Sequence, residues 1–168
     1  MPTLLLRNIR FAVTCDGEDR CLEGTDILCR DGFIQEMGPG LAAQADEVID
    51  CTGMLCYPGL VNTHHHLYRC FSRNLPRVRG LGRFDWLRAL YEIWKNRDRE
   101  AVRLSSLPAM GEMMKHGCTT CFDHHYVFPQ GSGDLLGEQF AAGEELGMRL
   151  VCSRGSMGLS RKDCGLPP

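Results

Sequence analysis

Two histidines, His64 and His66, lie at the end of an apolar stretch, residues 54–63, that the sequence predicts to be a buried β-strand. Side chains two positions apart on a strand share one face of the sheet, with a rise of about 6.6 Å between them. Two imidazoles placed in this way can bind one metal ion, each at about 2.0–2.1 Å. The alternative is a polar histidine cluster in a loop. The Pro58-Gly59 entry and the position at a strand end favour the metal site.

The composition is that of an ordinary globular protein and excludes several functional classes. The 168 residues are 43% apolar and 24% charged, with a net charge of −2 and a pI of about 6.3. Lysine and arginine are spread along the chain, which argues against nucleic-acid binding through a basic surface. The apolar run at the amino terminus is too short to be the core of a signal peptide, and no apolar run approaches the length of a membrane span. We therefore expect a cytoplasmic protein with neither nucleic acid nor membrane as a partner.

The first part of the chain, residues 1–57, is predicted to be a small β domain. Residues 27–30 and 33–37 alternate as strands do, and they flank Asp31-Gly32. This dipeptide supplies the positive φ angles that a two-residue hairpin turn requires. The pattern predicts short antiparallel strands joined by tight turns.

Beyond residue 57 the pattern changes to alternating helices and strands. After the strand that carries the histidines, the spacing of apolar residues predicts a helix capped by Asp85 and a second helix from Asp98 to His116. A strand, a helix and another strand follow, at residues 118–123, 135–146 and 148–153. Such an order is typical of parallel βα units with right-handed crossovers. Residues 58–168 are therefore predicted to form a second, α/β domain.

The segment Pro58–Leu67 resembles the first-strand metal motif of the amidohydrolase superfamily, whose members join a small β-sandwich to a (β/α)8 barrel. Further segments are similar to the 8-oxoguanine deaminase branch of the aminohydrolases, namely Trp86–Trp94, Gly117–Tyr126, Ser153–Met157 and Gly165–Pro168. The resemblance covers essentially the whole chain. It implies an α/β fold made of the first three βα units of such a barrel, preceded by the amino-terminal part of the β-sandwich in residues 1–57.

A complete barrel takes about 250 residues, which is more than residues 58–168 can supply. From this difference we expect the chain to be the amino-terminal portion of a longer, now truncated, enzyme. In the family, the remaining metal ligands and the residues that transfer protons come from later strands. The catalytic residues are therefore expected beyond residue 168, and the chain alone is expected to be inactive.

The resemblance also implies an activity and a cofactor. The activity is hydrolysis of a C–N bond other than a peptide bond, in which water replaces the amino group of an 8-oxoguanine-like purine base, so that ammonia leaves and an oxo group remains at that carbon. The cofactor is one divalent metal ion, zinc in the first instance and iron or manganese as alternatives, with His64 and His66 as ligands. The expected partner is a small heterocyclic amine as substrate, and a homo-oligomer is left open.

Four residues are predicted to bind the substrate. Arg154 follows the third strand, at a position where deaminase relatives direct a polar side chain at the substrate, and His125 ends the second strand. Trp86 could cover a planar base. Arg69 stands where this branch is expected to carry glutamine, so the exact substrate is open.

Two other functions compete with this prediction. One is a non-catalytic or inactive truncated protein on an amidohydrolase scaffold. The other is a hydrolase that acts on a nucleoside or a hydroxytriazine. Nucleoside-acting relatives tend to place a carboxylate for the ribose after the tryptophan-containing helix, where this chain has Lys95-Asn96. That difference favours a free base.

Overall fold

The chain divides into two compact units at Pro58 and Gly59. The computed structural model describes residues 2–159, so the predicted motif Gly165–Pro168 lies outside the described residues. Within residues 2–159, no helix has the length and apolar character needed to cross a membrane.

The first unit is a β-sheet built around its longest strands. Its five strands are β1 (Leu4–Val13), β2 (Cys21–Arg30), β3 (Phe33–Gly38), β4 (Glu47–Asp50) and β5 (Leu55–Cys56). The sheet order is β3-β2-β1-β4, with β5 also paired to β1. The β1–β2 and β2–β3 pairs are antiparallel, whereas β4 and β5 run parallel to β1. Its core contains Ile9, Ala12, Ile27 and Cys51.

The predicted hairpin at Asp31-Gly32 is confirmed. Strands β2 and β3 pair antiparallel on either side of this dipeptide. Asp31 has a φ of 52° and Gly32 a φ of 81°, the two positive values that the tight turn requires.

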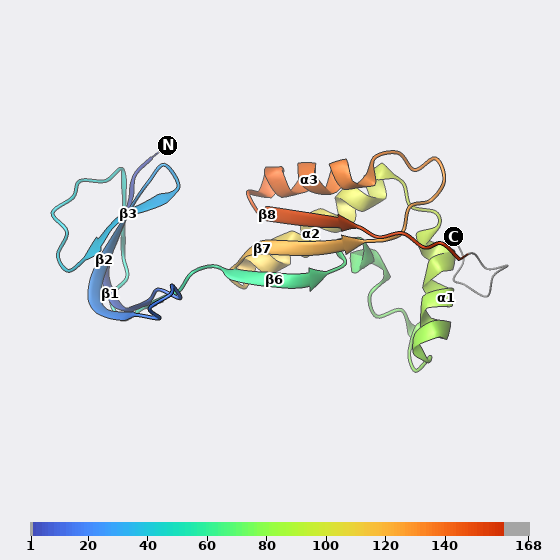
Figure 1. Ribbon diagram of the computed structural model, residues 1–168, viewed down its shortest axis with the longest axis horizontal. Helices are drawn as coiled ribbons and strands as arrows, with labels where there is room; N and C mark the ends of the chain where they lie inside the picture. Colours follow the sequence, from blue (N-terminus) through green and yellow to red (C-terminus); the bar gives the residue numbers. More distant parts are fainter. Residues whose placement is uncertain (1, 160–168) are drawn as a thin grey trace. The chain divides into compact units, whose positions relative to one another are not determined.

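The second unit is a three-stranded parallel sheet with helices. Its elements are β6 (Leu60–His65), the 3-10 helices η1 (Leu67–Ser72) and η2 (Pro76–Val78), α1 (Arg83–Trp94), α2 (Arg99–Lys115), β7 (Cys118–His125), α3 (Leu135–Leu146) and β8 (Arg149–Arg154). The order β6-β7-β8 is parallel throughout, as predicted. Helices α2 and α3 pack on each other and on β7 and β8, and α1 lies beyond the carboxyl ends of the strands (Figure 1).

Local sequence signals account for the helix ends. The Asp98 carboxylate accepts a hydrogen bond from Ala101 N–H and begins α2, and Gly147, with a φ of 73°, ends α3. The prediction for the first helix needs a correction. Helix α1 begins at Arg83 with Gly82 as its N-cap, and Asp85 lies within the first turn. An acidic residue there still interacts favourably with the helix dipole.

The single strand predicted for residues 54–63 is two strands. Residues 55–56 pair with β1 in the first unit, and residues 60–65 form β6 in the second. Pro58 lies between them and has no N–H to donate to a ladder. A Cβ atom at residue 59 would overlap the side chain of Thr119 in β7. The backbone can pass this close to β7 because residue 59 is a glycine. Strand β6 is also not buried, because Leu60 is 61% exposed in the described structure.

Two side-chain clusters hold the second unit together. One joins α2 and α3 to the sheet, through Met110, Cys118, Cys121, Ala142 and Met148 among others. The other is rich in aromatic residues and contains Tyr68, Val78, Leu90, Tyr91, Trp94 and Val127. In this aromatic cluster Trp94 Nε1 donates to Ser72 Oγ at 3.0 Å. The bond ties α1 to η1, the segment that follows the two histidines.

Candidate functional site

A cavity of about 540 Å3 opens at the carboxyl edge of the parallel strands. Parallel α/β folds bind ligands at this edge, because the loops that follow the strands converge there. We call it the histidine cavity. It is lined by His64, His66, Arg69, Arg83, Trp86, Leu87, His124, Tyr126 and residues 155–157.

His64 and His66 lie side by side in this cavity. Their ring centroids are 4.9 Å apart, with the ring planes nearly perpendicular. The strand periodicity predicts that both imidazoles point to one side of the sheet, and this arrangement agrees with it. The pair is therefore placed as two ligands of one ion would be.

The ring of His66 is oriented by a backbone group. Its Nδ1 lies 2.7 Å from the carbonyl oxygen of His124. Because a carbonyl only accepts, Nδ1 carries the proton and Nε2 keeps a free lone pair. Burial lowers the pKa of His66 to about 4, so the ring is neutral at neutral pH. Histidine ligands of metals typically have this tautomer and this kind of backbone support.

The donors present fit part of a zinc site. Two imidazoles are suitable zinc ligands, and a catalytic zinc commonly has three protein ligands. Among residues 2–159, no group of three or more histidine, cysteine, aspartate or glutamate side chains is placed to hold a metal ion. The two histidines are thus fewer than the three protein ligands that a catalytic zinc commonly has.

The two histidines at the end of β7 have opposite surroundings. His124 lines the histidine cavity, and its Nδ1 lies 2.6 Å from Ser153 Oγ. His125 is fully buried, with Nδ1 3.1 Å from Gln139 Oε1 and Nε2 3.0 Å from the Val127 carbonyl oxygen. Both ring nitrogens of His125 are therefore occupied within the core. This corrects the choice of His125 as a substrate ligand, since its neighbour His124 is the one at the cavity.

Arg69 and Trp86 do meet at the cavity. Arg69 comes from η1 and Trp86 from α1, and the Arg69 guanidinium carbon lies 5.2 Å from the indole centroid. Arg69 Nη2 also donates to the hydroxyl of Tyr126, just after β7. The sequence did not predict Arg83 and Tyr126 at the cavity, and of the two histidines that end the second strand His125 was chosen in place of His124. Only the alternation along 118–125 could have separated His124 from His125, provided that the buried face of the strand was known.

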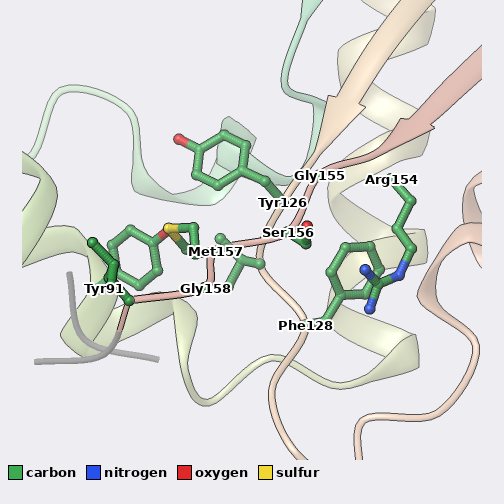
Figure 2. Close-up of a pocket in the computed structure, with 10 residues that line it drawn as sticks. Tyr91, Tyr126, Phe128, Arg154, Gly155, Ser156, Met157 and Gly158 are labelled. Atoms are coloured by element: carbon green, nitrogen blue, oxygen red, sulfur yellow. The ribbon is translucent and has the colours of Figure 1, made fainter. Parts of the chain in front are cut away.

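Arg154 lies in a different cavity from the histidines. Its guanidinium carbon is 4.6 Å from the ring centroid of Phe128, and both residues line a second cavity of about 270 Å3. Figure 2 shows the guanidinium beside Phe128, away from Tyr91 and Met157 at the other end. In the sheet Arg154 pairs with the buried His125, and Ser153 pairs with His124. Strand parity therefore directs Arg154 away from the histidine cavity, which corrects its predicted contact with substrate.

We expect Arg154→Lys to leave catalysis unchanged in an enzyme that carries this chain, because a side chain stacked on Phe128 does not touch a base held beside His64 and His66. Steady-state kinetics check this expectation. A loss of 10-fold or more in kcat/KM, the size expected for a lost hydrogen bond to a charged group, would return Arg154 to the substrate.

Comparison with known proteins supports one family. Residues 55–165 match the amidohydrolase family. The chain is 38% identical to hydroxydechloroatrazine ethylaminohydrolase of Pseudomonas sp. (strain ADP), over 95% of this chain and 36% of that protein. It is also 38% identical to 8-oxoguanine deaminase of Pseudomonas aeruginosa, over 100% of this chain and 37% of that protein. The chain thus spans little more than a third of the length of these relatives.

Solved structures agree with this result. Atrazine chlorohydrolase TrzN from Arthrobacter aurescens TC1, complexed with zinc, superposes with a TM-score of 0.87 at 28% identity. The match covers 98% of this chain and 38% of the hydrolase. The predicted α/β fold, which corresponds to part of an amidohydrolase barrel domain, is confirmed by this neighbour. The parallel sheet, the family match over residues 55–165 and the similarity to aminohydrolases along 95–100% of this chain all agree. The chain belongs to the amidohydrolase family.

Proposed function

We propose that this chain forms the amino-terminal part of a hydrolytic deaminase that acts on a purine-type base such as 8-oxoguanine. In this proposal residues 1–57 are the first part of a β-sandwich domain, and residues 58–168 are the first part of the barrel. The single observation that carries the proposal is the His64–His66 pair, with ring centroids 4.9 Å apart, in a cavity at the carboxyl edge of the parallel strands.

His64 and His66 are proposed as zinc ligands. When bound, zinc would supply hydroxide at neutral pH by lowering the pKa of a coordinated water. The protein prepares the His66 side chain for this role, because the His124 carbonyl holds its Nδ1 proton and leaves Nε2 free. The zinc that accompanies the related atrazine chlorohydrolase structure supports the choice of metal.

The walls of the cavity suit a flat, polar ring. Trp86 and Tyr126 provide aromatic surface, and Arg69 provides donors for oxo groups or ring nitrogens. The similarity to 8-oxoguanine deaminase over the full chain supports an oxopurine as the substrate class. Ammonia would be the leaving group.

A second candidate reaction is removal of an alkylamine from a hydroxytriazine. Hydroxydechloroatrazine ethylaminohydrolase is as similar to this chain as 8-oxoguanine deaminase is, at 38% identity. Both reactions hydrolyse a C–N bond on a flat heterocycle that carries oxygen. The same metal pair and the same aromatic wall would serve either one.

A chimeric enzyme can test the proposed function. We expect a chimera in which this chain replaces the matching 37% of the Pseudomonas aeruginosa 8-oxoguanine deaminase to bind zinc and release ammonia from 8-oxoguanine. The 168-residue chain alone should release no ammonia, because the two histidines are fewer than the three protein ligands of a typical catalytic zinc. Ammonia release is measured with both 8-oxoguanine and hydroxydechloroatrazine. A folded, zinc-loaded chimera that is inactive on both substrates would contradict the proposal.

A further inference from the structure

The histidine cavity carries positive charge without an acidic partner. Arg69 and Arg83 both line it, and none of its described lining residues is an aspartate or a glutamate. A guanidinium remains charged throughout the pH range in which proteins are stable. Within residues 2–159 the two guanidinium groups therefore favour an anionic organic ligand beside the two histidines.

The Arg69 guanidinium is held in place by aromatic rings. Its central carbon lies 5.2 Å from the Trp86 centroid, 5.1 Å from the Trp94 centroid and 5.5 Å from the Tyr126 centroid. These distances lie within the range of cation–π contacts. Because Tyr126 also accepts a hydrogen bond from Nη2, the group loses little freedom when a ligand binds.

Arg69 also has a donor that the described protein does not satisfy. Its Nε is buried and has no hydrogen-bond partner among residues 2–159. Buried donors without an acceptor are rare in native structures, and each one calls for an explanation. The Tyr68 hydroxyl beside Arg69 is likewise buried and without a partner, so Nε faces a protein acceptor and not the cavity.

We propose that Arg69 makes the histidine cavity selective for planar heterocycles that carry negative charge on an oxo-bearing edge. A guanidinium can donate two parallel hydrogen bonds, one to an oxo group and one to an adjacent deprotonated ring nitrogen. Tyr126 is a positioning residue in this arrangement, because its hydroxyl orients Nη2. The inference deepens the proposed function and rests on it for the location of the substrate. Its test requires neither metal nor turnover.

Two purines of similar size provide the test. Urate is negatively charged at neutral pH and carries oxo groups, whereas adenine is neutral and has none. Each is titrated into the 168-residue chain in the presence of a chelator, and the heat of binding is measured. We expect the chain to bind urate at least 10-fold more tightly than adenine. Arg69→Gln should weaken urate binding by about 10- to 100-fold, as expected for a lost hydrogen bond to a charged group, and leave adenine binding unchanged.

Matched variants separate recognition from packing and from net charge. Arg88→Gln removes one positive charge from the exposed face of α1, outside the cavity, and should keep the urate preference. Tyr126→Phe should weaken urate binding several-fold and leave adenine binding unchanged, whereas a structural defect would weaken both. Should Arg69→Gln unfold, Arg69→Lys keeps the charge and should still lose most of the preference.

The binding results and the chimera results test different claims. Equal affinities of the unmodified chain for urate and adenine, including no binding of either in the millimolar range, would overturn the inference. A urate preference that survives in a folded Arg69→Gln or Arg69→Lys chain would also overturn it. An inactive but folded chimera, by contrast, would contradict the deaminase assignment and leave the urate preference of the chain intact.

Discussion

Replacing His66 with alanine is expected to remove zinc from the chimeric enzyme and abolish ammonia release. His66 offers a neutral Nε2 lone pair at the cavity, and its orientation depends on the His124 carbonyl. Loss of a residue that only supports a ligand typically costs 10- to 100-fold in metal affinity. Loss of the ligand itself should cost more than about 100-fold. Elemental analysis of the purified protein and an ammonia assay measure the two effects, and His64→Ala should behave in the same way.

His116→Ala is the matched control for this experiment. His116 lies at the carboxyl end of α2, with Nδ1 2.9 Å from the Glu112 carbonyl oxygen, and its side chain is exposed. It does not line the histidine cavity. Its removal should leave zinc content and activity unchanged. Full zinc occupancy in His66→Ala would show that the metal binds elsewhere.

Asp123→Ala should destabilise the second unit by about 2–4 kcal/mol, because it leaves two buried donors without an acceptor. Asp123 is fully buried in β7. Its carboxylate accepts from Leu67 N–H at 2.5 Å and from Gln139 Nε2 at 2.9 Å. Burial raises the pKa of Asp123 despite these two bonds. Asp123→Asn should cost less, since its carbonyl oxygen can still accept from Leu67.

The measurement is urea unfolding followed by tryptophan fluorescence. Both tryptophans of the chain, Trp86 and Trp94, belong to the second unit, so the signal reports on that unit alone. Asp85→Ala is the matched control, because Asp85 is exposed on α1 and its loss should cost little. An Asp123→Ala chain as stable as this control would show that the two bonds to Asp123 contribute nothing net.

The hydrogen bond from Leu67 N–H to the Asp123 carboxylate also explains how the structure positions His64 and His66. Leu67 directly follows His66 and begins η1, and the carboxylate of Asp123 holds its N–H. This contact joins the end of β6 to β7 across 56 positions of sequence. No local pattern indicates it, since an aspartate near the end of a strand is equally suited to a turn or a cap.

Local signals in the sequence predicted much of the fold correctly. The turn at Asp31-Gly32, the cap at Asp98 and the stop at Gly147 depend on φ angles and hydrogen bonds within a few residues. The cap predicted at Asp85 was wrong for the opposite reason. The packing of α1 on the aromatic cluster allows the helix to begin earlier, at Arg83, without a side-chain cap.

By itself, the sequence determined that His64 and His66 share one side of their strand, because a two-residue period is a property of the extended backbone and needs no partner. It also determined the family, through motifs spread over the whole chain. Only the tertiary structure decided which face of β7 and β8 meets the cavity. Helices α2 and α3 cover one face of the sheet, and this places His125 in the core and Arg154 against Phe128. Parity relates residues within a strand, whereas the choice of the open face depends on the helices that pack on the sheet.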